Sequence, residues 1–370
     1  MRIAIDVSAL DRPYATGVEK ALLQLLEALR ARPDDNQYLL TAPRRPWLLP
    51  DYADPRFVEC MLASKGRTVL WRERKVPAFA HRERIDLWYS PVQAIPMLLD
   101  RPKVATLHEL SWMETTGVED EGSLRRRRLV AYMVARAADR IVAVSERTRD
   151  NFLQLHPRAA GRCVVVHHGV PQIFAAALPD RARLAEDYGL PADSPWLLTL
   201  GRALKRKGLP RAVRALRVLL DRTNGPWHMV MAGPRNAGLQ AALELAGRLG
   251  LDDRVHVPGY VKEVDLPTLY ASAAAFLMPS ESEGFGIPVL EAMAAGTPVV
   301  ASDSAALPEV AGGAALLVDF DDPLATAMVL ERALGLERDS WVARGRQRAA
   351  AFPVSGPARQ LLAVWRELAG

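Results

Sequence analysis

The chain has 370 residues, of which 49% are hydrophobic and 25% charged, and its formal net charge is +5. This length and composition predict a globular protein of roughly two domains and exclude a disordered chain. No apolar run approaches the roughly 18 residues that a membrane-spanning helix needs, so we expect none. The modest positive excess suits anionic small molecules, an anionic membrane or nucleic acid, without choosing among them.

The cysteines and the first residues indicate the compartment. Cys60 and Cys163 lie far apart and lack metal-ligand spacing. This favours a reducing cytoplasm over a disulfide framework or a structural zinc site. The opening MRIAIDVSAL is too short and too polar for a signal peptide, and it predicts a buried strand instead. We therefore expect a cytoplasmic protein.

Strands and helices alternate along the first half of the chain. Gly17 lies at the first strand-to-helix junction, an anion-compatible helix start, and Ser145 is a good helix N-cap. His108 directly follows a predicted strand. Periodicity predicts strands at 2–7, 38–41, 57–61, 87–89, 103–107, 140–144 and 162–167, and helices at 18–30, 125–138 and 146–155.

The alternation restarts after a Pro- and Ala-rich connection at about 171–195, in which we expect one short helix. Strands are predicted at 196–200, 227–232, 255–257, 274–279, 299–301 and 314–318, and helices at 209–220, 238–249, 264–273, 288–295 and from 323 to the end. The pattern predicts two doubly wound α/β domains. We place them at 1–175 and 176–352, and expect the C-terminal helix, about 353–370, to join the first.

The stretch 274–302 carries the strongest functional signal. It contains a strand, an acidic glycine-bearing loop, a helix and a second strand, which form a βαβ unit. Ligands of open parallel sheets bind beyond the carboxyl ends of the strands, where this loop lies. The helix start suits a phosphate. Glu283 and Glu291 flank that point.

Residues 283–296 read EGFGIPVLEAMAAG and are followed by TPVVAS and LPEV. This segment resembles the donor-site signature of retaining nucleotide-sugar glycosyltransferases of family 4, which have the GT-B fold. The likeness extends over most of the chain and is dense from about Leu198 onward. It implies two Rossmann-like domains facing a cleft and a nucleotide-sugar-dependent hexosyltransferase.

The resemblance also implies roles for residues of this segment. Glu291 would hold the ribose hydroxyls, and Glu283 would contact the transferred sugar near its reacting carbon, because carboxylates accept paired hydrogen bonds from vicinal hydroxyls. The glycines allow close backbone approach, and backbone N–H groups could reach the phosphates. The backbone positions concerned are Gly284, Phe285, Gly286 and Ile287.

A basic loop, GRALKRKG at 201–208, follows the predicted strand 196–200. Family members carry an Arg and a Lys at this strand end, and the pair stabilises the leaving diphosphate. Lys207 aligns with that Lys. Arg202 matches the Arg by following the glycine, and Arg206 matches it by preceding the Lys, so both stay candidates.

Three further positions resemble family site residues. His108 would face the transferred sugar across the cleft, with Glu109 standing where the family often has Asp. Gly17 would lie near the phosphates and the acceptor. Tyr260 and Val261 belong to a loop that resembles the one contacting the nucleobase.

We expect no metal and no cofactor. His167 and His168 are adjacent and point to opposite sides of an extended chain, and no D-x-D cluster ends a strand. The basic run Arg125, Arg126, Arg127 and Arg128 predicts either a solvated helix face or contact with an anionic membrane. Nucleic acid is disfavoured because no aromatic residues interleave the run.

The primary hypothesis is a retaining glycosyltransferase of surface polysaccharide or glycolipid synthesis. It would transfer a sugar, with GDP-mannose favoured as the donor because of the likeness to mannosyltransferase-like members, to a hydroxyl of a lipid-linked or oligosaccharide acceptor. The alternatives are another GT-B enzyme, such as a non-hydrolysing nucleotide-sugar epimerase, and a non-catalytic nucleotide-sugar-binding subunit. An oxidoreductase ranks last because the chain has no G-x-G-x-x-G fingerprint. The enzyme would be cytoplasmic, with peripheral attachment to the membrane as a further expectation.

Overall fold

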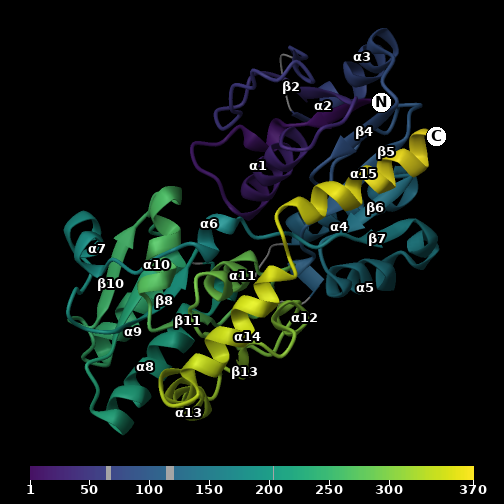
Figure 1. Ribbon diagram of the computed structural model, residues 1–370. Coiled ribbons are helices and arrows are strands. Elements are labelled where there is room, and N and C mark those ends of the chain that lie inside the picture. The colour runs from purple at the N-terminus through teal and green to yellow at the C-terminus, as the bar shows by residue number, and fades with distance from the viewer. Residues whose placement is uncertain (64–67, 114–120, 203) are drawn as a thin grey trace. The chain divides into compact units, whose positions relative to one another are not determined.

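A computed structural model describes residues 1–63, 68–113, 121–202 and 204–370 of the chain. The described chain before Val170, together with Val354–Gly370, forms one compact unit, and Val170–Pro353 forms a second. The sequence places the first division slightly later, between 175 and 176, and the second between 352 and 353. Figure 1 shows both units as ribbons.

The first unit is built on a seven-stranded parallel sheet in the order β3-β2-β1-β4-β5-β6-β7. The chain adds strands on one side of β1 and then on the other, so the order reverses between β1 and β4. The strands are β1 (Arg2–Asp6), β2 (Gln37–Ala42), β3 (Phe57–Met61), β4 (Leu87–Ser90), β5 (Lys103–Leu107), β6 (Arg140–Ala143) and β7 (Cys163–Val165).

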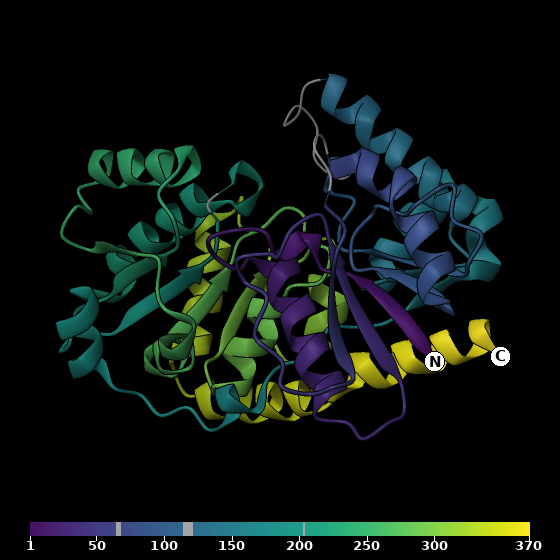
Figure 2. The same cartoon turned by 90° about the horizontal axis from the view of Figure 1, so that it is seen from above.

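The C-terminal helix packs on this first sheet. Trp365 is fully buried in one cluster with Ile3 and Ile5 of β1, and its ring lies 5.1 Å from that of Tyr89. Both chain termini therefore lie on this unit (Figures 1 and 2). Its helices are α1 (Gly17–Arg30), α2 (Thr68–Arg74), α3 (Val76–Glu83), α4 (Glu121–Ala137), α5 (Glu146–Leu155) and α15 (Ser355–Ala369).

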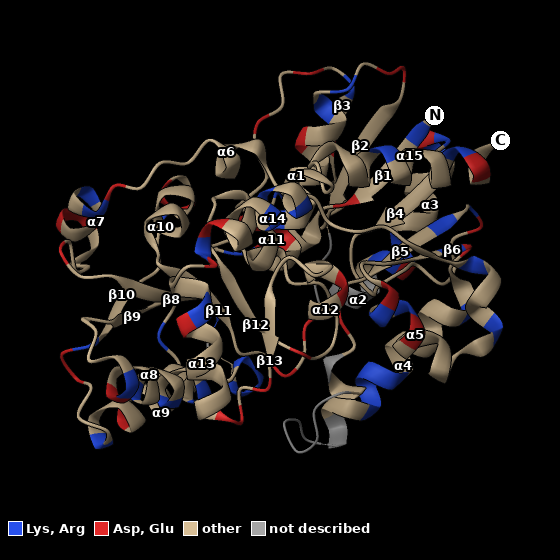
Figure 3. Ribbon diagram, turned by 60° about the horizontal axis from the view of Figure 1, so that its bottom comes forward, with Lys and Arg blue, Asp and Glu red and all other residues tan. Residues whose placement is uncertain are grey.

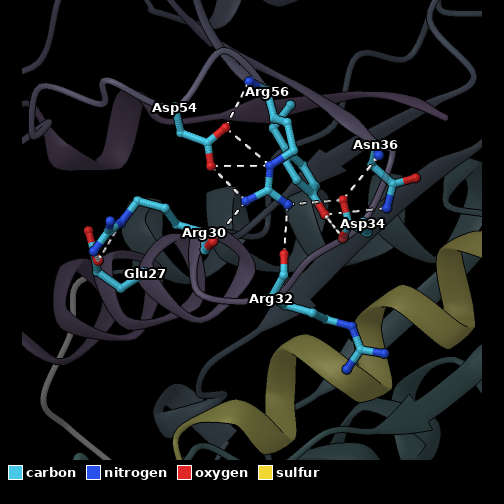
Figure 4. Close-up of polar contacts among 8 residues, drawn as sticks. Glu27, Arg30, Arg32, Asp34, Asn36, Asp54 and Arg56 are labelled. Atoms are coloured by element: carbon cyan, nitrogen blue, oxygen red, sulfur yellow. Dashed lines mark hydrogen bonds and ion pairs between the residues drawn. The ribbon is translucent and has the colours of Figure 1, made fainter.

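Arg56 closes the C-terminal end of α1, where no glycine terminates the helix (Figure 4). Its guanidinium donates to the carbonyls of Arg30 and Arg32, each at 2.7 Å. The same group pairs with Asp54 at 2.6 Å and with Asp34 at 3.3 Å. One side chain thus satisfies the last carbonyl of α1 and a carbonyl of the turn that follows, and it ties the segment before β3 to the α1–β2 turn.

The second unit has a six-stranded parallel sheet in the order β10-β9-β8-β11-β12-β13. Here the order reverses between β8 and β11, which are hydrogen-bonded neighbours. The strands are β8 (Trp196–Leu200), β9 (His228–Ala232), β10 (Val255–Gly259), β11 (Ala275–Met278), β12 (Val299–Ser302) and β13 (Leu316–Val318).

Helices cover both faces of this sheet, with α8, α9 and α13 on one and α6, α10 and α11 on the other (Figures 1 and 3). Helix α8 buries Ala212, Leu216 and Leu219 at helical spacing against the sheet core. The helices are α6 (Gln172–Ala175), α7 (Arg181–Tyr188), α8 (Leu209–Thr223), α9 (Ala237–Arg248), α10 (Leu266–Ser272), α11 (Ile287–Ala294), α12 (Leu307–Ala311), α13 (Pro323–Leu334) and α14 (Arg338–Ala350).

The structure differs from the sequence expectations in a few elements. The connection after Gly169 holds two helices, α6 and α7, where we expected one; Asp180 caps α7 by accepting from the N–H of Arg183 at 3.0 Å. Helices α2 and α3 were not predicted, and α3 ends at Arg84 in a left-handed conformation that usually marks glycine. Among the described residues, no helix combines the length and apolarity that a bilayer crossing needs.

Candidate functional site

The strand order of the second unit brings two predicted site loops together. β8 and β11 are parallel neighbours, so the loop after β8 and the loop after β11 leave the same edge of the sheet. This is the reversal point, where ligands of open α/β sheets bind. A cavity lies at this edge and is lined by Gly201, Arg202, Lys207, Gly233 and Ser280, among others.

Glycines let the backbones at this edge touch. Gly208 has φ +66° and directly precedes α8; a Cβ atom there would overlap the carbonyl oxygen of Pro279. Gly233, with φ +146°, stands in the same relation to the carbonyl of Gly201. Both positions require glycine, on conformational and on steric grounds. The close approach fixes the distance between the basic loop and the acidic loop.

Glu283 and Lys207 form an ion pair between these loops. The Arg206 guanidinium lies 3.8 Å from the same carboxylate, and the Glu283 side chain is only 9% exposed. Burial raises the pKa of the Glu283 carboxyl, but the charges of Lys207 and Arg206 outweigh this effect and leave the pKa below its usual range. The carboxylate is therefore ionised at neutral pH.

The two candidate arginines have different environments. Arg206 is buried, and its guanidinium donates to the carbonyl of Ser282 at 2.5 Å. Arg202 is exposed and lines the same cavity as Lys207. Arg206 is thus engaged in holding the acidic loop, while Arg202 lines the cavity together with Lys207.

Glu291 lies in α11 and is only 2% exposed. It accepts a hydrogen bond from the hydroxyl of Tyr270 at 2.8 Å. Burial, together with the charge of Glu291, raises the pKa of Tyr270 well above its usual value, so the hydroxyl stays protonated and donates. Tyr270 was missed at the sequence level; the available signal was a tyrosine in the helix 266–272, because a buried tyrosine hydroxyl needs a hydrogen-bond partner.

The loop between Glu283 and α11 is buried along its length. The loop consists of Gly284, Phe285 and Gly286, and Ile287, the first residue of α11, is buried as well. Gly286 caps α11 with φ +102°, and a Cβ atom there would lie 2.8 Å from the Leu307 side chain. The turn therefore depends on glycine, and it sets the backbone of this loop against the start of α11.

Tyr260 and Val261 follow β10 at the same sheet edge. Gly259, with φ +80°, ends the strand and turns the chain. Tyr260 is 48% exposed, whereas Val261 is buried. An exposed aromatic ring beyond a strand end is available to stack on a planar ligand group.

His108 lies at the end of β5 in the first unit, and its ring stacks on that of His168 at 5.4 Å. Its Nε2 lies 2.7 Å from the carbonyl oxygen of Pro91. A carbonyl only accepts, so Nε2 carries the proton. Burial lowers the pKa of both histidines, and that of His168 well below its usual value. The sequence did not indicate His168 as a neighbour of His108; its ring stacks on that of His108, and the charge of His108 contributes to the lowered pKa of His168.

Gly17 is the first residue of α1, and a Cβ atom there would meet nothing within 4 Å. Packing therefore does not require glycine at this position. Glu19 caps the same helix start, accepting from the backbone N–H of Thr16 at 2.9 Å, and it also pairs with Arg12 at 3.0 Å. The helix start thus holds a carboxylate of its own, and the role expected for Gly17 stays a prediction.

The basic run lies on α4 of the first unit, where blue segments mark Lys and Arg in Figure 3. Arg125–Arg128 are exposed, and the apolar side chains of Leu129 and Tyr132 that follow them are more than half exposed, at 58% and 53%. Across the described ranges, no group of three or more His, Cys, Asp or Glu side chains is arranged to hold a metal ion.

Two family models match the chain. Residues 15–172 match the model described as Glycosyltransferase Family 4, and residues 180–348 match the one described as Glycosyl transferases group 1. The O-antigen chain mannosyltransferase B of Escherichia coli is 30% identical over 286 residues, which cover 74% of this chain and 73% of that protein.

A second kind of relative shares a shorter segment. The D-inositol 3-phosphate glycosyltransferase of Kineococcus radiotolerans is 31% identical over 206 residues, or 53% of this chain. The match spans 47% of that protein, about half its length.

Solved structures share the fold over the full length. Sucrose-phosphate synthase from Thermosynechococcus elongatus has a TM-score of 0.79 at 23% identity, covering 99% of this chain and 98% of that one. HepE from Anabaena, in complex with UDP and glucose, has a TM-score of 0.79 at 20% identity, covering 100% of both chains. The expected fold is confirmed as GT-B, with two parallel-sheet α/β domains.

Proposed function

The chain belongs to the group 1 and family 4 glycosyltransferases, and on that basis we propose that it moves a sugar from a nucleotide donor to an acceptor hydroxyl with retention of configuration. The observation that carries this proposal is the Lys207–Glu283 pair at the reversal point of the second sheet. In this proposal Lys207 would serve a phosphate and Glu283, paired with it, would serve the sugar. Fixed charges of this kind stabilise charge that develops during reaction.

Lys207 and Arg202 are the proposed partners of the diphosphate. Lys207 has three N–H donors, so it can retain Glu283 and bind a phosphate oxygen as well. Arg202 is exposed at the same cavity, whereas the guanidinium of Arg206 is buried on the Ser282 carbonyl. In the reaction the bond from the anomeric carbon to the diphosphate breaks and the nucleotide leaves with the electron pair. The acceptor oxygen bonds to the anomeric carbon on the same face, and the proton of the acceptor hydroxyl passes to the leaving diphosphate oxygen.

The remaining residues at this edge of the second sheet are the proposed contacts of the nucleoside and the sugar. Glu291 would accept from the ribose hydroxyls while Tyr270 holds one of its oxygens in place. Tyr260 and Val261 would contact the base, and Glu283 with the backbone of Gly284–Ile287 would contact the sugar and phosphates. In the first unit His108, with Gly17, would serve the sugar and acceptor side.

We propose GDP-mannose as the donor, on the strength of the mannosyltransferase relative that covers most of this chain. UDP-sugars are the competing class, since the HepE structure holds UDP and glucose. A thermal-shift panel of GDP-, UDP-, dTDP- and ADP-sugars separates them, because a ligand that binds the native state raises the melting temperature. GDP-mannose should give the largest shift; a shift with UDP-sugars alone would contradict the donor assignment.

A lipid-linked acceptor is the proposed sugar recipient, and α4 is the proposed membrane contact. Arg125–Arg128 offer charge to anionic headgroups, and the exposed Leu129 and Tyr132 offer apolar surface to the interface. The protein should sediment with vesicles containing phosphatidylglycerol and not with pure phosphatidylcholine. A variant with Gln at these four arginine positions should lose the sedimentation; unchanged binding would remove the idea.

A further inference from the structure

A side-chain cluster packed against the acidic loop has no assigned role in the sugar transfer proposed for this protein. Its centre is Arg348, in the last turn of α14, whose guanidinium donates to the carbonyls of Glu309 at 2.6 Å and Val310 at 2.9 Å. These carbonyls belong to the C-terminal turn of α12. Arg348 therefore supplies hydrogen-bond donors to carbonyls at the end of α12 that have no donor within the helix.

The Arg348 guanidinium packs against an aromatic ring and a glycine. Its Cζ atom is 4.7 Å from the centroid of the Phe352 ring. Gly312, with φ +53°, also lies against the guanidinium, since a Cβ atom there would come within 2.6 Å of Cζ. Burial lowers the pKa of Arg348 from its ordinary high value. A cation enclosed in this way, and bonded to two carbonyls, is held in one orientation.

Both ends of this cluster reach the acidic loop. The ring of Phe352 packs edge-on against that of Phe285, with centroids 6.0 Å apart and planes at 67°. At the other end, the N–H of Ala306, the residue before α12, donates to the backbone carbonyl of Glu283 at 3.4 Å. Leu307 of α12 lies directly against Gly286. The loop is thus braced from two sides by elements that Arg348 connects.

The same cluster lies beside the two residues at which the chain enters and leaves the second unit. Phe352 accepts a backbone hydrogen bond from the N–H of Val170 at 2.9 Å, and Val170 and Pro353 form a parallel β-bridge. Val170 begins the second unit and Pro353 ends it. Phe352, whose ring supports Phe285, therefore lies where the chain leaves the second unit. The backbone of Phe352 is hydrogen-bonded to Val170, where the chain enters that unit.

We propose that Arg348 and Phe352 are positioning residues of the transfer reaction: they hold Phe285 and α12, and through them keep Glu283 where the donor sugar reacts. The inference rests on the proposed function, since it assigns these residues to that same site. Neither side chain is expected to touch the donor. Loosening the brace should therefore affect the chemical step and leave nucleotide binding through Lys207 and Glu291 in place.

The test compares Arg348→Ala and Phe352→Ala with Arg344→Ala. Arg344 lies on the same helix, and its guanidinium stacks on the Trp341 ring at 4.9 Å, so it is a matched control away from the loop. We expect kcat for sugar transfer or donor hydrolysis to fall roughly 10- to 100-fold in the first two variants, because misplacing a reacting group costs on this order. Binding of GDP and of UDP, measured by calorimetry, should change less than about threefold in each variant. Phe352→Tyr, which keeps the ring, should retain kcat.

Hydrogen exchange provides the second readout and does not depend on turnover. In Arg348→Ala and Phe352→Ala, the peptides carrying residues 283–287 and 304–307 should exchange faster than in Arg344→Ala. Unchanged exchange, or kcat equal to that of the control, overturns the positioning role. A parent protein that neither binds a nucleotide nor turns over a donor refutes the proposed function instead, while the exchange result still decides the brace.

Discussion

Arg202 and Arg206 lie four positions apart in one basic loop, yet their surroundings differ. Arg206 is buried and donates to the Ser282 carbonyl, whereas Arg202 is exposed at the cavity that Lys207 also lines. A hydrogen bond from a charged group contributes about 1.5–3 kcal/mol. Truncation of Arg202 should therefore affect ligand binding, whereas truncation of Arg206 should affect stability.

We predict that Arg202→Ala weakens nucleotide-diphosphate binding about tenfold or more with little change in unfolding free energy, since about 1.4 kcal/mol corresponds to tenfold. Arg206→Ala should instead lower the free energy of unfolding by about 1–3 kcal/mol, because it removes a charged hydrogen bond to the buried loop. Calorimetry and urea denaturation on the two variants check this. The opposite pattern would assign the diphosphate to Arg206.

The stacked histidines of the first unit make stability depend on pH. Burial lowers the pKa of His108 and of His168 below the value of about 6.5 that unfolded histidine has. As pH falls through about 6.5, the unfolded chain binds protons that the native state does not, so stability present above that pH is progressively lost.

His168→Gln should therefore lose less unfolding free energy between pH 7.5 and pH 5.5 than the parent does. The matched control is His81→Gln, at an exposed histidine of α3, which should follow the parent. Urea denaturation at the two pH values measures the difference. A His168→Gln slope equal to that of the parent would show that the stacked pair does not titrate as described.

At the scale of elements, the junction between η4, the short 3-10 turn Lys205–Lys207, and α8 decides the geometry of the basic loop. Gly208 occupies a left-handed conformation there, and a Cβ atom would overlap the Pro279 carbonyl. Gly208→Ala adds conformational strain of about 1 kcal/mol or more and also forces the two loops apart. The substitution thus acts on the spacing between Lys207 and Glu283.

We predict that Gly208→Ala lowers both the melting temperature and kcat, because it moves the cation away from the carboxylate. Gly161→Ala is a suitable control, since a Cβ atom at Gly161 would meet nothing within 4 Å and no left-handed conformation is needed there. Thermal unfolding and donor turnover of the two variants test this. Equal behaviour of both would mean that the loops can separate without consequence.

Much of the architecture was predictable because parallel strands buried on both faces read as short apolar runs between helices. The strand 103–107 and the strand 57–61 were placed at their observed bounds. Helices α2 and α3 were not predicted because they are short. Arg84, not a glycine, occupies the left-handed position after α3, so the sequence does not mark the end of this helix. Local sequence patterns predict well whether an element is a helix or a strand. They predict a helix end poorly when no glycine or proline marks it.

The loops of the site could be located from the sequence, but their partners could not. Lys207 and Glu283 are distant along the chain, and only the strand order makes β8 and β11 neighbours. Tyr270 beside Glu291, His168 beside His108, and Arg348 behind Phe285 are likewise contacts between elements. Periodicity describes one element at a time, so contacts of this kind need the three-dimensional fold.

At the scale of the whole molecule, each unit has a parallel sheet whose order reverses once, and each reversal places two loops at one sheet edge. The charged pair that carries the proposal belongs entirely to the second unit. A non-hydrolysing epimerase would act on the donor alone, and a binding subunit would hold it without turnover. Product analysis therefore separates these readings from a transferase.

The most direct measurement is turnover of the donor that the thermal-shift panel selects, with products separated by chromatography, for the parent, Glu283→Ala, Lys207→Ala and the exposed control Lys205→Ala. The parent and Lys205→Ala should release nucleoside diphosphate and transfer or free the sugar without epimerising it. Glu283→Ala and Lys207→Ala should fall on the order of 100-fold or more, the typical cost of removing a group that stabilises developing charge. Full activity in both variants, or an epimerised donor as the product, would contradict the account.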